Sequence, residues 1–442
     1  MPTMTAADTA WFDMDRPTNP MVITAVMWFD GPVAVDLVRG IVGERLVPRF
    51  TRFRQRVVEH PLTRRHRWEE DPRFALDRHV HHRHLPRPGD RAALHAVVSE
   101  LMSEQLPRDR PLWQLWVLEG EDTSAVVTRL HHCLADGQAL AYVLAALTDD
   151  IDLAVPPAPD TTDHLVIDLA RRTLGLARHP TTLVGAVPAL AREGTSLARL
   201  VLLPADRRTS LRGRLTGGKR AAWSEPTPLA EVTAVGHVLG GTVNDVLMSA
   251  LTGGLARYLS SRGPVPTEVR AMVPVDLRPA DDPVDAALGN RFGMLVVGLP
   301  VGVADPVARL AELTRRTARA KASPEGVVAS GVIATLGRVP RPAERALVEL
   351  FTAKASVLVT NVAGPREPLT FAGRRLRGIV GWAPASGSVG LTVSIFSYAG
   401  KVVLGVAADA ALVPHPEALL AAFDEELAAL RAAAGTAGDV SA

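Results

Sequence analysis

A proline-rich run, LAVPPAPDTTD at residues 153–163, interrupts the chain and splits it into two parts. Proline lacks a backbone N–H and fixes φ, so neither a helix nor an internal strand continues through such a run. On each side of it, apolar segments of strand length alternate with segments of helical periodicity. A chain of 442 residues divided in this way is long enough for two domains, each with its own hydrophobic core.

The first part opens with residues 22–29, VITAVMWF, an uninterrupted apolar run that is typical of a buried strand. The elements predicted after it are a helix at 33–46, an edge strand at 77–85, a helix at 92–106, strands at 114–119 and 124–130, and a helix at 138–147.

The second part is predicted to contain a strand at 232–239, a helix at 244–259, strands at 268–274, 294–299, 356–360, 390–397 and 401–407, and a terminal helix at 416–433. Because strands and helices mix throughout, we expect an α/β or α+β fold in which mixed sheets are covered by helices. The expected divisions are an N-terminal subdomain at 1–160, a linker region at 161–222 and a C-terminal subdomain at 223–442.

The composition of the chain limits the classes of function and the cellular locations that are possible for the protein. A net charge of +2 argues against a nucleic-acid partner, and 47% hydrophobic residues argue against global disorder. The single cysteine, Cys133, excludes an intramolecular disulfide and fits a reducing compartment. The acidic N-terminal segment lacks the pattern of a signal peptide, and no apolar run reaches the length of a membrane-spanning helix. We therefore expect a cytoplasmic protein that meets lipid only from the membrane surface.

Positive charge is concentrated in one segment. Residues 171–220 hold eleven Lys/Arg against two acids, Glu193 and Asp206, and the apolar segment LARLVLLP lies among them. Such a run is either a solvated linker or a surface that binds anionic lipid, where each cation contributes about 1 kcal/mol. Both interpretations stay open at this point.

The segment RLHHCLADGQAL, residues 129–140, carries the clearest chemistry. An apolar strand runs into His131 and His132, and a histidine at a strand end can act as a fixed general base near neutral pH. Adjacent strand residues point to opposite faces, so only one of the two can face a given site. Asp136 occupies an N-cap position, and Gly137 allows close backbone approach. The plain alternative is a capped helix after a strand, with incidental histidines.

This segment resembles the HHxxxDG motif of the coenzyme A-dependent acyltransferase superfamily, to which chloramphenicol acetyltransferases and peptide-synthetase condensation domains belong. Over nearly its full length the chain is similar to bacterial wax ester synthase/diacylglycerol acyltransferases. The further matching segments are DRPTNPMVITAVMWFDG at 15–31, PLW at 111–113, TVNDV at 242–246, PVDLR at 274–278, GNRFG at 289–293, and NVAGP at 361–365, where Ala363 replaces a usual proline.

The resemblance implies two chloramphenicol-acetyltransferase-like subdomains with a tunnel between them. It implies transfer of a fatty acyl group from acyl-CoA, a co-substrate, to a lipid alcohol such as diacylglycerol or a long-chain alcohol. No permanently bound cofactor and no metal are expected. The partners would be these substrates, together with peripheral contact to a membrane or lipid-droplet surface. Two rivals are a natural-product tailoring or condensation-type acyltransferase, and a lipid carrier with an inactive site.

By the same resemblance, His132 is the general base, while His131, Asp136 and Gly137 are structural. The motif aspartate is expected to pair with an arginine of the second half, and the candidates are Arg278 and Arg291. Asn244 begins a predicted helix, where it either contacts the thioester carbonyl and the oxyanion or simply caps the helix.

Four other patterns were weighed against this assignment. His131 and Asp136 also fit the HxxxxD pattern of glycerol-phosphate acyltransferases, but only SPEG at 323–326 resembles the partner motif of that family. The cluster HVHHRH at 79–84 could bind zinc, yet no Cys, Asp or Glu lies at a ligand-like spacing close by, which favours a solvated strand edge. Cys133 could be a nucleophile, but burial as a small side chain is favoured. No GxSxG motif indicates a serine hydrolase.

Overall fold

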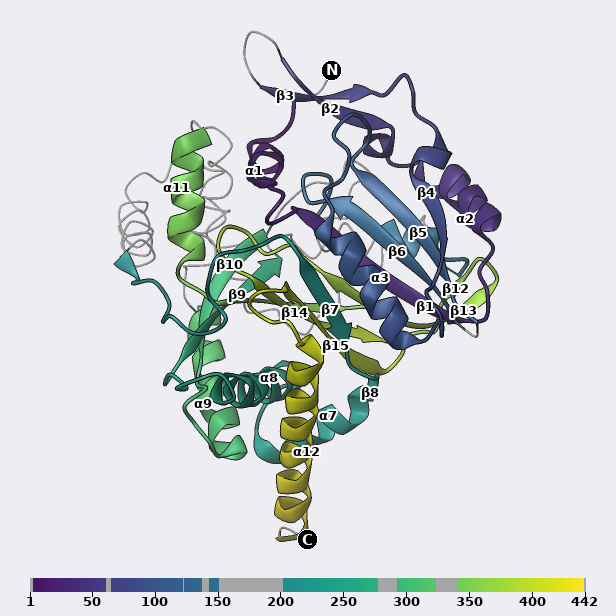
Figure 1. Ribbon diagram of the computed structural model, residues 1–442. Coiled ribbons are helices and arrows are strands. Elements are labelled where there is room, and N and C mark those ends of the chain that lie inside the picture. Colours follow the sequence, from purple (N-terminus) through teal and green to yellow (C-terminus); the bar gives the residue numbers. More distant parts are fainter. Residues whose placement is uncertain are drawn as a thin grey trace, which may run out of the picture.

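The computed structural model describes residues 3–60, 65–121, 123–136, 143–150, 202–276, 292–322 and 341–440 (Figure 1). Two mixed sheets lie one above the other in this view, with the helix α3 (Arg91–Ser103) in front of their junction. A separate small hairpin, β2 (Gln55–Glu59) with β3 (His66–Glu70), extends from the N-terminal part.

The first sheet has the strand order β12–β13–β1–β6–β5–β4. Its strands are β12 (Thr370–Phe371), β13 (Arg374–Trp382), β1 (Val22–Asp30), β6 (Thr123–His131), β5 (Trp113–Glu119) and β4 (Val80–His84). The apolar run at the start of the chain is thus a central strand, antiparallel to both of its neighbours. One of those neighbours, β13, comes from the second half of the chain, so the two halves share this sheet.

The second sheet has the order β10–β9–β11–β14–β15–β7, and β8 also pairs with β15. Its strands are β10 (Phe292–Leu299), β9 (Val269–Asp276), β11 (Val357–Ala363), β14 (Leu391–Tyr398), β15 (Lys401–Asp409), β7 (Lys219–Trp223) and β8 (Thr227–Pro228). β14 and β15 form the predicted hairpin, with Ala399 and Gly400 at positive φ in its two-residue turn.

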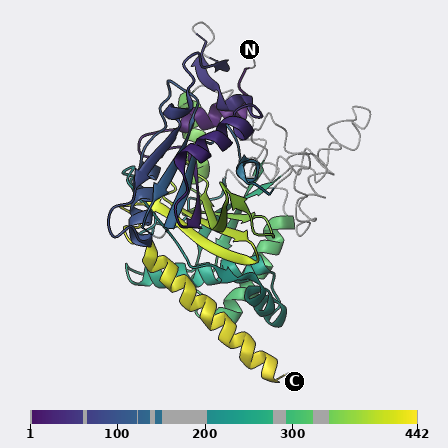
Figure 2. The same cartoon turned by 90° about the vertical axis from the view of Figure 1, so that its right-hand side faces the viewer.

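Helices cover both sheets. They are α1 (Ala6–Met14), α2 (Val35–Ile41), α3, α7 (Leu229–Leu239), α8 (Val243–Ser260), α9 (Pro306–Ala322), α11 (Arg341–Thr352) and α12 (Pro416–Val440), with short turns of other helix types at Val42–Leu46, Thr51–Phe53 and Leu76–Arg78. α12 packs on the second sheet at its start and projects from the molecule at its C-terminal end (Figure 2). Among the described residues, none of the helices combines the length and apolar character that crossing a bilayer requires.

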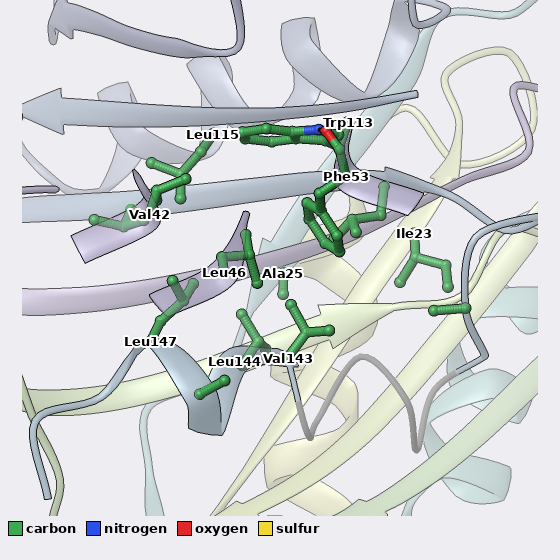
Figure 3. Close-up of a cluster of buried hydrophobic side chains, with 14 of the residues drawn as sticks. Ile23, Ala25, Val42, Leu46, Phe53, Trp113, Leu115, Val143, Leu144 and Leu147 are labelled. Atoms are coloured by element: carbon green, nitrogen blue, oxygen red, sulfur yellow. Dashed lines mark hydrogen bonds between the residues drawn. The ribbon is translucent and has the colours of Figure 1, made fainter. Parts of the chain in front are cut away.

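Three apolar clusters hold these layers together. One packs side chains of the first sheet against the helical turns near residues 42–53 and against residues 143–147 (Figure 3). A second fills the space between the second sheet and α7, α8, α9 and α12. The third joins the two sheets. In it, Trp223 of β7 packs with α3 and with the opposite face of the first sheet, to which Trp382 of β13 belongs. In addition, Ser99 and Ser103 of α3 accept hydrogen bonds from the backbone of the edge strand β7.

Most predicted elements are confirmed, but the strand predicted at 232–239 is wrong. These residues belong to the helix α7, whose valines Val232 and Val235 are buried one helical turn apart. β-branched residues misled the prediction, whereas Gly240 at φ 80° ends α7 as a helix C-cap glycine does. Of the helix predicted at 138–147, residues 143–147 are helical and the rest lies outside the described residues. So does most of the linker region predicted at 161–222.

Candidate active site

His131 and His132 lie where β6 ends between two neighbouring strands. The backbone N–H of His131 donates to Leu112 O at 3.0 Å, and that of His132 donates to Met21 O at 2.8 Å. Val22 of β1 lies opposite His131 in the sheet register. The strand β6 therefore holds both histidines in fixed positions at its own C-terminal end, inside the first sheet and not at an outer strand.

The side chain of His132 stacks on an aromatic residue of α1. The centroid of its ring lies 3.9 Å from that of Trp11, and the two planes differ by 9°. Both side chains are buried, with exposed fractions of 4% for His132 and 5% for Trp11. A stack this flat leaves the imidazole little rotational freedom, and it lets a positively charged imidazole interact with the face of the indole.

These two side chains form one wall of a small cavity of about 30 Å³. The remaining lining comes from the second sheet and from the loop after β13: Met272, Pro274, Met294, Leu358, Ala383, Pro384, Ser386 and Val389. The cavity is therefore mainly apolar, and it lies at the junction of the two sheets with an imidazole at one side.

The cavity lies where two strands of the second sheet separate. β9 and β11 pair only at Val357 with Ala271 and at Leu358 with Met272. Beyond these pairs, β9 continues beside β10 while β11 continues beside β14. Pro274 lies on the separated part of β9, where a residue without an N–H is tolerated because no strand of the described residues adjoins that side.

His131 has different surroundings. It is 1% exposed, and its Nε2 lies 3.9 Å from the Asp15 carboxylate. Its Nδ1 accepts a hydrogen bond from the backbone N–H of Cys133, so it carries no proton there. Burial lowers the pKa of His131 to about 4, although Asp15 acts in the opposite direction. His131 is therefore neutral at neutral pH.

Asp15 organises the segment beneath the histidines. Its carboxylate accepts hydrogen bonds from Met21 N at 2.8 Å, from Gln105 Nε2 at 2.7 Å and from Arg108 Nη2 at 3.0 Å. It thereby ties the beginning of β1 to the chain just after α3. Sequence reasoning noted Asp15 only as part of an acidic N-terminus, although it opens one of the segments that carry the family resemblance.

Asn19 ties the same N-terminal segment to the loop that lines the cavity. Its Nδ2 donates to the carbonyl oxygens of Ala385 and Gly387, and its Oδ1 accepts from Lys219 Nζ at 2.9 Å. Burial lowers the pKa of Lys219, while Asp409 acts in the opposite direction. Asn19 and Trp11 were both missed by sequence reasoning, because an N-terminal asparagine or tryptophan has no distinctive pattern of its own.

Asn244 does not cap its helix, which corrects one of the two roles considered for it. The N-cap of α8 is Thr242, and a reciprocal capping box with Asp245 satisfies that terminus. Asn244 Oδ1 instead accepts a hydrogen bond from Asn361 Nδ2 at 2.9 Å. Two of the segments that carry the family resemblance, TVNDV and NVAGP, therefore meet in space.

The other predicted site residues are placed only in part. Asp136 is buried, with an exposed fraction of 4%. Gly137, Arg278 and Arg291 lie outside the described residues, so the pairing of Asp136 with one of these arginines stays a prediction.

Cys133 is completely buried, as expected for a small packed side chain. Burial raises the pKa of its thiol well above the usual range, and Asp8 acts in the same direction. The reactive thiolate is therefore disfavoured at neutral pH, and a nucleophilic role for Cys133 is not supported.

The fold, in which two mixed sheets meet beside a histidine at a strand end, is similar to the folds of solved acyltransferases and condensation domains. The wax ester synthase/diacylglycerol acyltransferase from Marinobacter aquaeolei VT8 has a similar structure, with a TM-score of 0.70 and 22% identity, covering 98% of this chain and 100% of that one. A starter condensation domain of rhizomide synthetase RzmA, solved in complex with C8-CoA and Leu-SNAC, gives 0.59 and 14%, covering 98% and 94%.

Within this class, two family models match the chain. The wax ester synthase/diacylglycerol acyltransferase catalytic domain matches residues 4–247, and the WS/DGAT C-terminal domain matches residues 288–431. A protein of Mycobacterium tuberculosis strain H37Rv named "Probable diacyglycerol O-acyltransferase tgs1" is 32% identical over 436 residues, covering 95% of this chain and 92% of that one. The chain belongs to the wax ester synthase/diacylglycerol acyltransferase family, and it is an acyltransferase of that type.

Proposed function

We propose that the protein transfers a fatty acyl group from acyl-CoA to a lipid alcohol, with His132 as the general base. The observation that carries this proposal is the position of the His132 imidazole, held at a strand end and facing an apolar cavity between the sheets. His131, by contrast, packs against Asp15 beneath the site. Its role is structural, and so is that of Asp136.

In the proposed reaction the alcohol oxygen attacks the thioester carbonyl carbon while His132 takes the hydroxyl proton. The tetrahedral intermediate then collapses, the carbon–sulfur bond breaks, and the imidazolium returns the proton to the leaving thiolate. The products are an ester and free coenzyme A. Asn244, which accepts from Asn361 through Oδ1, is proposed to turn its amide N–H groups towards the developing oxyanion.

The cavity walls fit an aliphatic substrate. Met272, Met294 and Leu358 line the cavity together with His132, and flexible methionine side chains adapt to chains of different shape. A cavity of about 30 Å³ has room for only a few water molecules, so an acyl chain requires the surrounding side chains or the loop 383–390 to move. The C8-CoA complex of the similar condensation domain supports acyl-CoA as the donor.

Contact with a lipid surface belongs to the same proposal, because diacylglycerol and long-chain alcohols reside in membranes or lipid droplets. In the described part of the basic segment, Arg207, Arg208, Arg214 and, on β7, Arg220 are exposed, and Leu202, which precedes them in sequence, is 79% exposed. Arg212 differs from them, since its Nη1 donates to the backbone oxygens of Ala353 and Ala355. The proposed docking surface therefore comprises Arg207, Arg208 and Arg214, which lie outside the strands, together with Leu202.

The test is acyl transfer from radiolabelled acyl-CoA to hexadecanol, to diacylglycerol and, separately, from a carrier-protein thioester donor. We expect His132→Ala to lower turnover by about 10²–10⁴-fold while the variant still unfolds in a cooperative thermal transition. Cys133→Ala, the matched change at the adjacent buried residue, should keep most of the activity. Wild-type turnover in His132→Ala would refute the assignment of the base. A preference for the carrier-protein thioester would indicate a condensation-type enzyme instead.

A further inference from the structure

Three metal-ligating side chains meet at the outer edge of the first sheet, away from the candidate active site. His82 and His84 lie on the edge strand β4, on either side of Arg83, so they share one face of the strand. β4 pairs in parallel with β5, and the register places His84 beside Glu119. Val80 and Val117, on the same strands, both belong to the first apolar cluster, which fixes the face from which these groups project.

The ligand atoms already converge. His82 Nε2 lies 2.9 Å from Glu119 Oε2, and His84 Nδ1 lies 3.6 Å from the same oxygen. All three ligand atoms lie within 4.8 Å of one another, and the two histidine rings meet edge to face at 4.7 Å. Because Zn–N and Zn–O bonds are about 2.0–2.2 Å long, ligand atoms around one zinc ion lie about 3–3.5 Å apart. Small side-chain rotations at this exposed edge are therefore sufficient to enclose an ion.

Arg83, the arginine between the two histidines, does not share their face of β4. Arg83 points to the opposite face of β4, where its guanidinium makes two hydrogen bonds with the Glu100 carboxylate of α3, at 2.8 and 2.9 Å. The carboxylate of Glu119 therefore faces two imidazoles rather than an arginine, and neutral imidazole is a metal ligand.

We propose that His82, His84 and Glu119 form a binding site for a divalent transition-metal ion such as Zn²⁺. Two imidazole nitrogens and one carboxylate oxygen suit Zn²⁺, Ni²⁺ and Cu²⁺, whereas Ca²⁺ and Mg²⁺ prefer ligand sets made only of oxygen. Sequence reasoning set zinc aside because no Cys, Asp or Glu lies at a ligand-like spacing close to HVHHRH along the chain. The missing ligand is supplied by the neighbouring strand.

The site is separate from the proposed chemistry. Glu119 is the last residue of β5, and Trp113, the first, pairs with Leu130 next to His131. At about 3.3 Å per residue, the length of β5 puts the ion about 20 Å from the candidate base. An ion held by residues of both strands would instead link the edge strand β4 to β5, and so stabilise the edge of the sheet.

Isothermal titration of the full chain, free of any histidine tag, with ZnCl₂ tests the proposal. We expect one equivalent to bind, and at an ion concentration 100 times Kd the melting temperature should rise by about 3 °C. His84→Ala and Glu119→Gln should each weaken this binding at least 10-fold and reduce the thermal shift to about half or less at the same ion concentration. Both residues are exposed or half-buried, so these variants are expected to fold.

His415→Ala is the matched control, because His415 Nδ1 lies 3.4 Å from Glu417 Oε1 in an exposed pair that lacks a second histidine. This variant should bind Zn²⁺ as the wild type does. The proposal is overturned if the wild type binds no stoichiometric equivalent, or if His84→Ala and Glu119→Gln keep wild-type affinity. Neither result bears on His132, whose test is acyl transfer.

Discussion

Replacing Trp11 with leucine removes the aromatic face that lies 3.9 Å from the His132 ring, while an apolar side chain remains in the same buried place. The stack matters most when His132 holds the alcohol proton, because only then is the imidazole a cation. An aromatic pair contributes about 0.5–1.5 kcal/mol beyond its buried area, and a desolvated cation over an indole face about 2 kcal/mol.

Loss of about 1.4–2 kcal/mol in the transition state lowers kcat/KM by about 10- to 30-fold. The same loss makes His132 a weaker base, so the acidic limb of the pH–rate profile should move about one pH unit lower. This shift distinguishes an effect on the base from a general loss of structure, which lowers the amplitude of the profile without moving its limb.

The assay is acyl transfer to a lipid alcohol between pH 5 and 9, with urea unfolding measured for every variant. Phe12→Leu is the matched control: Phe12 is also buried on α1, but it packs on His66 and lies 5.8 Å from His131. Its acidic limb should stay at the wild-type pH. A Trp11→Leu limb that coincides with that of the wild type, or an equal shift in both variants, would refute an effect of the stack on the base.

Burial lowers the pKa of His131 to about 4, so between pH 6.5 and 4 only the unfolded chain takes up a proton at this residue. The free energy of unfolding should therefore fall by about 2 kcal/mol between pH 7 and 5. His131→Asn should reduce that loss, as measured by urea titrations. Burial also raises the pKa of Glu344 to about 7, with Asp13 acting in the same direction. The charged carboxylate therefore destabilises the fold most above pH 7. Glu344→Gln should be more stable than the wild type by up to about 3 kcal/mol at pH 8, and this difference should shrink towards pH 5. Equal stability of the two proteins at pH 8 would contradict this prediction. Binding of the protein to anionic vesicles, measured by flotation, should weaken at high salt. Replacing Arg207, Arg208 and Arg214 with alanine should weaken the same binding by up to about 100-fold. Binding that responds to neither change would exclude electrostatic docking.

Local patterns were sufficient to predict many of the elements. The apolar run of β1, the motif strand β6 and the capped helix α8 each carry their own signal within a short window. The placement of His132 at a strand end followed from the same window. Where residue type and periodicity disagreed, as in the valine-rich α7, the choice between strand and helix depended on packing against α8 and α12, which no local window contains.

The surroundings of the site depend on contacts between distant segments. Trp11 reaches His132, Asn19 reaches the loop at Ala385, and Glu119 completes the histidine cluster only through strand pairing. Residues that meet only in the folded chain leave no spacing rule in a single sequence. Of the two roles considered for Asn244, capping does not hold, because Thr242, two residues earlier, is the N-cap and forms a capping box with Asp245.

Because β13 lies late in the sequence, β1 gains one of its two neighbouring strands only near the end of synthesis. β1 and β6 can pair once residues 22–131 have left the ribosome, but the other edge of β1 is completed only by Arg374–Trp382. At 5–20 residues per second, the intervening stretch of roughly 250 residues takes about 12–50 s to translate. Throughout that interval a central apolar strand has an open edge that can pair with another nascent chain. A fragment that ends at residue 247, where the match to the catalytic-domain family model stops, would never close that edge.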